Sequence, residues 1–263
     1  MSWLRRARVG RWVHFLALPL AGVDVHGGVP AVLAAVRGVL VAFLVLAFGY
    51  TLNALADRWM DGPAKNAFVT STPPLTSALL VSLAVSALVA SSGAPLAARA
   101  ATIVALVSGV LYSVGPRLKR FALVGSLANL TNFVPLLWVG EAESVAPRAV
   151  TWIAVAFACL LLQNQLIHEA ADREEDVAGG VHTTVVALGP TMAAWIAAGL
   201  GLLLVLDARA RGVPVWPLAL VFAVMFPVAL ARGGSDARRM ARLRLVHRAA
   251  SFAAGVTLYL AGS

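Results

Sequence analysis

Two clusters of polar and acidic residues, both spaced at four-residue intervals, offer the chemistry in this sequence. They are Asn53-x3-Asp57-x3-Asp61 (the first cluster) and Asn164-x3-His168-x3-Asp172-x3-Asp176 (the second cluster). Because a step of four residues keeps side chains on one face of a helix, each cluster predicts a stripe of oxygen ligands. Mg²⁺ prefers carboxylate oxygens and is often shared with the phosphate oxygens of a substrate. The spacing therefore predicts a magnesium site for a phosphorylated substrate.

The two clusters also hold most of the negative charge of the chain. Of its 12 acidic residues, seven lie in these segments: Asp57, Asp61, Glu169, Asp172, Glu174, Glu175 and Asp176. Carboxylates beside lipid are unfavourable unless a cation or a polar cavity compensates them. The pairs Asp57/Asp61 and Asp172/Asp176 would hold one or two Mg²⁺ ions around a diphosphate, where the metal neutralises the charge of a departing pyrophosphate. Loss of pyrophosphate from an allylic diphosphate would leave a carbocation, and an apolar membrane cavity would protect this cation from water.

The composition excludes an ordinary soluble domain. The 263 residues are 60% hydrophobic and 13% charged, with a mean hydropathy of +0.85, which predicts an all-α polytopic integral membrane protein. Nine hydrophobic runs approach the roughly 20 residues of a transmembrane helix: 12–29, 31–55, 74–93, 97–114, 121–140, 147–168, 184–206, 214–231 and 245–262. The single Cys159 rules out an intrachain disulfide and a cysteine-rich metal site.

The positively charged residues orient the nine predicted helices. With the N-terminus in the cytoplasm, Arg99, Arg148, Arg209 and Arg211 fall in outer loops and Arg37 lies inside the second run, while all other Lys and Arg residues lie on the inner side. Both clusters then face the cytoplasm, and the compact chain favours a bacterial-type plasma membrane. The net charge of +9 reflects this topology and contact with the lipid bilayer, and its dispersal among the helices argues against nucleic-acid binding.

The two clusters also suggest an internal repeat. They lie at the ends of the second and sixth predicted helices, which run in the same direction and are four helices apart. We therefore expect one domain over residues 1–263, built from two related halves around a central cavity, with each half contributing one cluster to the site.

Both clusters resemble the Asp-rich motifs of the UbiA superfamily of intramembrane prenyltransferases. The first cluster is similar to the first motif of that family, and Asp172-x3-Asp176, followed by Gly179-Gly180 and Thr183-Thr184, is similar to the second. Tyr112-Ser113 with Pro116 and Lys119 resembles the segment that such enzymes carry after their fourth helix. The resemblance covers nearly the whole chain, and it implies a single UbiA-like transmembrane domain.

The resemblance implies Mg²⁺-dependent transfer of a prenyl group from a polyprenyl diphosphate to a lipophilic, membrane-soluble acceptor, with release of pyrophosphate. Carried over by position, Asn53 and the four cluster aspartates would form the metal and diphosphate site, with the aspartates as metal ligands and catalytic residues. Lys119, with Arg117 or Lys65, would contact the pyrophosphate. Tyr112 would orient the acceptor or stabilise the cation.

Two departures from the family pattern limit what can be carried over. Ala54 stands where many members have an acidic residue, and Gly62-Pro63 follows Asp61 without the Arg-Pro element of the quinone, chlorophyll and haem branches. The acceptor of those branches is therefore not transferred to this chain. Acceptor identity, prenyl chain length and oligomeric state depend on packing that the sequence does not specify.

Several polar residues near the clusters have two interpretations. Asn164 and His168 share the stripe of Asp172, so they either contact the substrate or make structural hydrogen bonds. Glu169 either supports the site from behind or forms a salt bridge. Asn129 either bonds to a neighbouring helix or lines the cavity.

Two other functions use similar residues. A cation- or proton-coupled secondary transporter would use the same carboxylates, but it predicts them near the middle of the membrane in broken helices. A phosphatidyl-alcohol transferase would gather its aspartates in one segment, whereas this chain divides them between two distant segments.

Overall fold

The structure is a computed structural model that describes residues 6–23, 28–141, 147–212, 219–233 and 236–262. Apart from one isolated parallel bridge between Phe121 and His182, the regular structure in this part of the chain is helical. An α-helix pairs its backbone N–H and C=O groups within itself. A segment inside lipid requires this, because lipid offers no hydrogen-bond partners. The predicted all-α class is confirmed.

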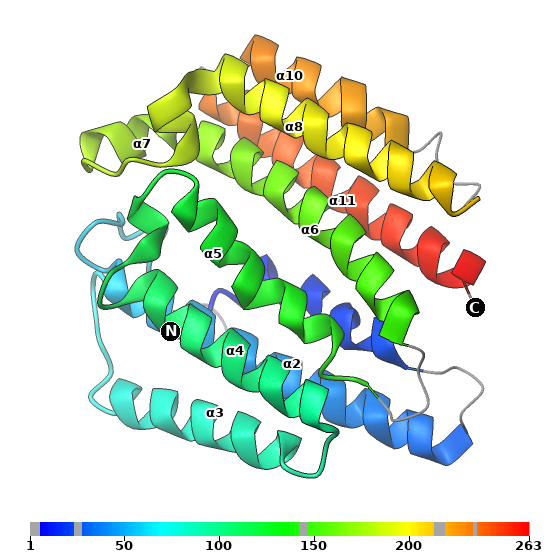
Figure 1. Ribbon diagram of the computed structural model, residues 1–263. Coiled ribbons are helices and arrows are strands. Elements are labelled where there is room, and N and C mark those ends of the chain that lie inside the picture. The colour runs from blue at the N-terminus through cyan, green and yellow to red at the C-terminus, as the bar shows by residue number, and fades with distance from the viewer. Residues whose placement is uncertain (1–5, 24–27, 142–146, 213–218, 234–235, 263) are drawn as a thin grey trace. The chain divides into compact units, whose positions relative to one another are not determined.

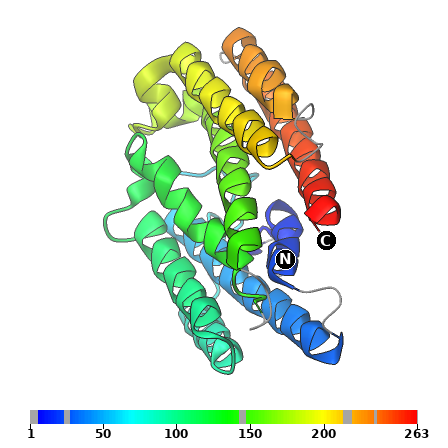
Figure 2. The same cartoon turned by 45° about the vertical axis from the view of Figure 1, so that its right-hand side comes forward.

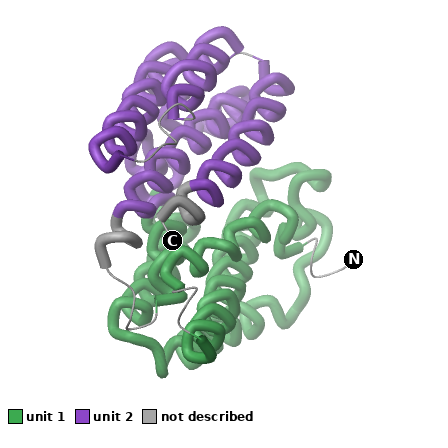
Figure 3. The backbone as a smooth tube through the Cα atoms, turned by 90° about the vertical axis from the view of Figure 1, so that its right-hand side faces the viewer, with its two compact units in different colours: residues 1–118, 131–150 green, residues 119–130, 151–263 purple. Residues whose placement is uncertain are grey.

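The chain forms two compact units, which Figure 3 shows in different colours. Unit 1 consists of Met1–Leu118 and Thr131–Val150, and unit 2 consists of Lys119–Leu130 and Thr151–Ser263. The first cluster therefore belongs to unit 1 and the second to unit 2. This division agrees with one cluster for each half, while the relatedness of the halves stays a prediction.

Unit 1 is built around one long apolar helix, α2. Its described elements are η1 (Val9–Arg11), η2 (Val13–Gly22), α2 (Gly28–Ala56), α3 (Thr76–Ser91), α4 (Leu96–Ser113) and η4 (Val134–Leu137). Helix α2 packs against α3, α4 and η2 (Figure 1). A Cβ atom at Gly38 would lie 2.6 Å from the Cα of Gly140, so the small side chain allows this close packing. The C-terminal end of α2 presents the first cluster.

Unit 2 contains, wholly or in large part, the remaining helices. They are η3 (Leu118–Arg120), α5 (Val124–Phe133), α6 (Pro147–Ala171), α7 (Arg173–Ala178), α8 (Thr184–Ala210), the π-helical turn η5 (Val221–Met225), α10 (Phe226–Gly233) and α11 (Ala237–Gly262). Helices α8, α10 and α11 lie side by side in both Figure 1 and Figure 2. The second cluster spans the end of α6 and the short α7.

A buried glutamine fixes α6 inside unit 2. The Nε2 of Gln163 donates to the carbonyl oxygen of Ala197 in α8 at 2.6 Å and to that of Phe222 in η5 at 2.9 Å. A π-helical turn departs from the regular hydrogen-bond ladder, which leaves carbonyl groups available for such contacts. The Oε1 of Gln163 lies 3.2 Å from Nε2 of His247 in α11. The helix that carries the second cluster is therefore joined to three neighbours by satisfied polar groups.

Within the described residues, helical segments overlap each of the nine predicted runs, although not over the predicted lengths. Among the described residues, the helices long and apolar enough to cross a membrane are Gly28–Ala56, Leu96–Ser113, Trp152–Ala171 and Thr184–Ala210. Four further apolar helices in this part of the chain are shorter, and α11, with 26 residues, is not among the candidate spans, so the count of nine spans stays a prediction.

The first predicted span differs from expectation. Residues Val13–Gly22 form the ten-residue 3₁₀ helix η2, which contains Pro19. At about 2.0 Å per residue, a helix of this length is too short to cross a roughly 30 Å hydrocarbon core. Residues 24–27 of the same run lie outside the described part of the chain. The sequence correctly indicated an apolar helical segment here, but it predicted a transmembrane α-helix where the structure has a short 3₁₀ helix.

The packing of α8 against η5 leads to a stability prediction. A Cβ atom at Gly201 would lie 2.5 Å from the backbone nitrogen of Ala223, so Gly201→Ala should overpack the contact and cost about 1–3 kcal/mol. At Gly199, on the same helix, no described atom beyond the surrounding backbone of α8 lies within 4 Å of the added Cβ, so Gly199→Ala should leave stability unchanged or slightly raised. Thermal melting of the two variants in detergent tests this; equal melting temperatures would contradict the packing.

Candidate functional site

The first cluster follows the end of α2 without losing its helical spacing. The helix ends at Ala56, yet the backbone N–H of Asp57 donates to the Asn53 carbonyl at 3.0 Å, and that of Asp61 donates to the Asp57 carbonyl at 2.9 Å. Two further turns with i→i+4 bonds therefore keep the three residues on one side of the chain. The four-residue backbone spacing of the first cluster is therefore observed, while its role as a set of metal ligands stays a prediction.

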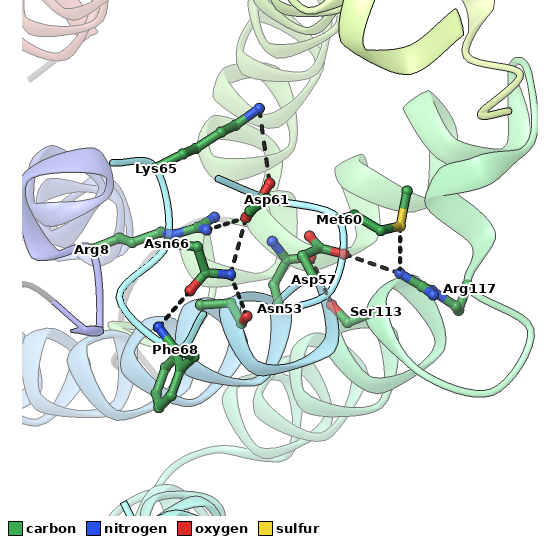
Figure 4. A network of polar contacts seen from close by, with 11 residues as sticks. Arg8, Asn53, Asp57, Met60, Asp61, Lys65, Asn66, Phe68, Ser113 and Arg117 are labelled. Carbon is green, nitrogen blue, oxygen red and sulfur yellow. Dashed lines mark hydrogen bonds and ion pairs between the residues drawn. The ribbon is translucent and has the colours of Figure 1, made fainter. Parts of the chain in front are cut away.

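Asp61 is surrounded by cations and donors, as Figure 4 shows. Its Oδ2 lies 2.5 Å from Nη2 of Arg8 and accepts a hydrogen bond from Nδ2 of Asn66 at 3.1 Å, while its Oδ1 lies 4.0 Å from Nζ of Lys65. The side chains of Arg8 and Asp61 are only 9% and 12% exposed. Burial makes this charge-assisted pair stronger than a surface ion pair. Lys65 thus lies beside Asp61, while its predicted contact with a pyrophosphate stays a prediction. From the sequence, Arg8 was assigned to membrane topology alone.

The C-terminal end of α4 reaches the first cluster as well. Nη2 of Arg117 donates to Oδ1 of Asp57 at 3.1 Å, and the hydroxyl of Ser113 donates to Oδ1 of Asn53 at 3.3 Å (Figure 4). Arg117 adopts a left-handed backbone conformation with φ of 50°, which is uncommon for a residue with a side chain. Tyr112 directly precedes Ser113 on α4 and is half-buried. The structure therefore brings Arg117 to the predicted carboxylate.

A buried asparagine completes this region and was not recognised from the sequence. Nδ2 of Asn66 donates to the carbonyl oxygen of Ala54 at 2.7 Å as well as to Asp61, and its Oδ1 accepts from the backbone N–H of Phe68 at 3.0 Å. The Ala54 carbonyl is one of the last in α2, where intrahelical donors run out. Asn66 therefore caps α2 and orients Asp61 at the same time.

The second cluster shows the same behaviour at the end of α6. Asp172 lies between Ala171, the last residue of α6, and α7. Its backbone N–H donates to the His168 carbonyl at 3.0 Å, and the N–H of Asp176 donates to the Asp172 carbonyl at 2.9 Å. Nδ1 of His168 lies 3.3 Å from Oδ2 of Asp172. The stripe is again preserved, and His168 is placed against the first aspartate of the pair.

The remaining predicted residues of the second cluster have distinct surroundings. The hydroxyl of Thr183 donates to Oδ2 of Asp176 at 3.3 Å. Asn164 is 8% exposed, and its Oδ1 has no hydrogen-bond partner among the described residues. Lys119 lies in η3 and is half-buried. Its neighbour Arg120 accepts a backbone hydrogen bond from His182 at 3.2 Å, so the segment that carries Lys119 pairs with the loop after α7.

For two of the four residues whose roles were left open, Asn129 and Glu169, the structure shows hydrogen bonds to neighbouring helices. Nδ2 of Asn129 in α5 donates to Oε1 of Gln165 in α6 at 3.2 Å, which is the interhelical interpretation. Glu169 is buried and accepts hydrogen bonds from Ser126, Gln165 and the backbone of Val185. Glu169 therefore supports the end of α6 through hydrogen bonds.

The chemistry of the donor set suits Mg²⁺. Within the described ranges, no group of three or more His, Cys, Asp or Glu side chains is gathered closely enough to hold a metal ion. Each cluster instead supplies two carboxylates and an amide. Mg²⁺ commonly takes one or two protein carboxylates and completes its shell with water and phosphate oxygens, so a pair of aspartates fits this ion.

Comparison with known proteins identifies the family. The UbiA prenyltransferase family model matches residues 15–252, and the chain therefore belongs to this family. It is similar to the 4-hydroxybenzoate octaprenyltransferase of Vibrio cholerae serotype O1, with 29% identity over 188 residues. That match covers 68% of this chain and 63% of the relative, so the chain matches less than two thirds of the length of these curated relatives.

Solved structures show the same fold. A UbiA homologue from Archaeoglobus fulgidus bound to DMAPP and Mg²⁺ has a TM-score of 0.74 at 21% identity, covering 96% of this chain and 98% of the other. Digeranylgeranylglyceryl phosphate synthase also gives a TM-score of 0.74, at 15% identity, covering 98% of this chain and 96% of the other. Together with the long apolar helices, these findings confirm the predicted family and an integral membrane protein.

The contacts of Asn66 lead to a second prediction. Asn66→Ala would leave the Ala54 carbonyl and the Phe68 N–H unpaired in a buried position, and it should destabilise the protein by about 1–3 kcal/mol. Asn66→Asp keeps the size but loses the donor, and it adds a negative charge beside Asp61, so it should be at least as unstable. Thermal melting measures both effects. A wild-type melting temperature for Asn66→Asp would show that the amide donor has no structural role.

Proposed function

We propose that this protein is an intramembrane prenyltransferase that uses Mg²⁺ to move a prenyl group from a polyprenyl diphosphate to a membrane-soluble acceptor, releasing pyrophosphate. The observation that carries the proposal is the position of the two aspartate pairs, each at the end of a long apolar helix, in a chain of the UbiA family. Homologue structures that bind DMAPP or GPP together with Mg²⁺ support the choice of donor and metal.

The charged groups around each pair suit a diphosphate. Asp57 and Asp61, like Asp172 and Asp176, would hold Mg²⁺, which when bound neutralises the negative charge that develops on the leaving pyrophosphate. Guanidinium groups bind phosphate oxygens in a bidentate manner. Arg8 and Arg117 already lie against the aspartates of the first cluster, so they would reach the oxygens of a diphosphate bound there.

The bond changes assign tasks to the other predicted residues. The bond between the allylic carbon and the diphosphate oxygen breaks, pyrophosphate leaves with the electron pair, and the acceptor attacks the allylic cation. A cluster aspartate or the released pyrophosphate takes the acceptor proton. Tyr112 would orient the acceptor or stabilise the cation. Lys119 and Lys65 would contact the diphosphate, and the apolar helices would exclude water.

The surroundings of Asn164 in unit 2 support a substrate-binding role for this residue. A buried carbonyl oxygen without a partner costs free energy, so such groups are rare unless a ligand or water satisfies them. The unpaired Oδ1 of Asn164 lies two helical turns before Asp172, on the same stripe. We therefore place Asn164 and His168 among the substrate-binding residues.

We further propose that the active site and the N-terminus lie on the cytoplasmic side of a bacterial-type plasma membrane. The distribution of Lys and Arg supports this orientation. The pair between Arg8 and Asp61 supports placing the N-terminal segment and the first cluster on the same side. Carboxylates at helix ends, rather than at the centres of long helices, also favour a transferase over a secondary transporter.

The metal role of the aspartates can be tested by pyrophosphate release. In lipid nanodiscs with Mg²⁺, prenyl diphosphates of several lengths and a lipid extract, the wild-type protein should release pyrophosphate, and Asp57→Asn or Asp172→Asn should abolish it because an amide is a weak Mg²⁺ ligand. Asp236→Asn provides the matched control, since Asp236 is exposed and caps the start of α11. Removal of Mg²⁺ with a chelator should have the same effect as the cluster variants.

Turnover near the wild-type value in both cluster variants would refute the metal role. Absence of release with every donor, from protein that melts cooperatively, would refute the proposed reaction. The prenylated compound recovered from the lipid extract would identify the acceptor.

Lys119 should act on donor affinity. Loss of a charged hydrogen bond to phosphate costs roughly 1.5–3 kcal/mol, so Lys119→Ala should raise KM for the prenyl diphosphate about tenfold to hundredfold. Arg99→Ala removes an exposed positive charge far along the chain from both clusters and should leave KM unchanged. An unchanged KM in Lys119→Ala, measured with the same donor, would remove Lys119 from the phosphate site.

A further inference from the structure

A buried carboxylate outside the predicted metal ligands joins three helices of unit 2. Glu169, in the last turn of α6, is 5% exposed. Its Oε1 accepts hydrogen bonds from the hydroxyl of Ser126 in α5 at 2.8 Å and from Nε2 of Gln165 at 3.2 Å. Its Oε2 accepts from the backbone N–H of Val185 in α8 at 3.2 Å. Both carboxylate oxygens are therefore occupied by donors from inside the protein.

The position of these donors explains how a carboxylate is tolerated there. Burying an ionisable group in an apolar bundle is unfavourable unless its hydrogen bonds are satisfied. Val185 is the second residue of α8, which begins at Thr184, and the N-terminal end of a helix carries a partial positive charge. The start of α8 therefore stabilises Glu169, and Glu169 in turn fixes the start of α8 against α6.

A directional chain of hydrogen bonds extends from Glu169 to the segment after η3. Because Ser126 uses its one hydroxyl hydrogen for Glu169, the contact of 2.9 Å between Ser126 and Thr184 must have Thr184 as its donor. The hydroxyl oxygen of Thr184 accepts from the backbone N–H of Leu123 at 3.0 Å. Leu123 has a φ of 59°, a left-handed conformation that needs such support.

Residues directly before Thr184 make further hydrogen bonds, to the backbone beside Lys119 and to the side chain of Asp176. The N–H of His182 donates to the carbonyl of Arg120, directly after Lys119. Thr183, which precedes the threonine of the chain, donates to Asp176. Glu169 itself lies three residues before Asp172. Through hydrogen bonds and neighbouring residues of the backbone, the buried group of Glu169, Ser126 and Thr184 is thus connected to the backbone around Lys119 and to Asp176, and it lies one helical turn before Asp172.

We propose that Glu169 is a positioning residue: it holds the Lys119 segment and Asp176 in register with Asp172, so that one diphosphate meets all three groups. It acts from behind the site and has no contact with substrate. This inference rests on the proposed function, because the three groups need this alignment only if the protein binds a prenyl diphosphate.

The substitution Glu169→Gln tests the proposal with little change in size. An amide has one accepting oxygen, so its NH₂ group must face either the backbone N–H of Val185 or the Nε2 of Gln165, both of which only donate, whereas the Ser126 hydroxyl can turn to accept. Loss of a supporting hydrogen bond behind a metal ligand commonly costs a factor of about 10–100 in affinity or activity. We expect Glu169→Gln to raise KM for the prenyl diphosphate about tenfold. Glu174→Gln is the matched control, because Glu174 is exposed in α7.

A double-mutant cycle separates positioning from folding. If Glu169 acts through the Lys119 segment, Glu169→Gln should raise KM much less in the Lys119→Ala background than in the wild type. A purely structural role would lower kcat through the folded fraction and leave KM unchanged in both backgrounds. Ser126→Ala removes one hydrogen-bond donor to Glu169 while retaining the carboxylate, so it should give a smaller rise in KM. This variant replaces Glu169→Gln in the test if Glu169→Gln does not fold.

The outcomes distinguish this inference from the function on which it rests. If Asp172→Asn abolishes turnover while Glu169→Gln and Ser126→Ala keep the KM of Glu174→Gln, the positioning role is overturned and the prenyltransferase stands. Equal rises in KM with and without Lys119 would also overturn it. If the wild-type protein releases no pyrophosphate with any donor, both proposals fail.

Discussion

Carboxylates at the end of an apolar helix must be compensated, and much of the described polar structure follows from this requirement. Asp57 and Asp61 are compensated by guanidinium groups at 3.1 Å and 2.5 Å. Glu169 is compensated by hydrogen-bond donors and by the start of a helix. The difference suits their proposed tasks, because a carboxylate beside cations can exchange partners with a metal and a phosphate, whereas one enclosed by fixed donors cannot.

The ends of α2 and α6 combine two features that are normally opposed. A helix end frees backbone groups and changes the direction of the chain, yet in both clusters i→i+4 bonds continue past the last helical residue. Side chains thus remain on one stripe while the chain leaves the apolar helix. Asn66 makes this feasible in unit 1 by pairing the Ala54 carbonyl. The proposed ligands consequently stand at the end of an apolar helix, where a bound diphosphate would keep its charge near water and its prenyl tail in lipid.

The support behind each cluster differs between the units. In unit 1 the first cluster is held by side chains that approach from distant loops, such as Arg8 and Arg117. In unit 2 the second cluster depends on buried hydrogen-bond networks centred on Gln163 and Glu169, both within α6. Fully satisfied networks of this kind specify one arrangement, because any shift leaves a buried polar group unpaired. The register of α6 is therefore fixed at two levels along its length.

The sequence by itself determined the helical class, the four-residue stripes and the family resemblance, because hydropathy and periodicity are local properties of the chain. It missed the 3₁₀ form of η2, where Pro19 lacks the backbone N–H that a regular α-helix needs. It did not indicate the hydrogen-bond partners of Arg8, Ser126 and Thr184. Arg8 is 53 residues from Asp61, and Ser126 is 43 residues from Glu169 and 58 residues from Thr184. The tertiary structure alone decided which donors meet Asp61 and Glu169, because pairing at such separations depends on how the helices of each unit pack.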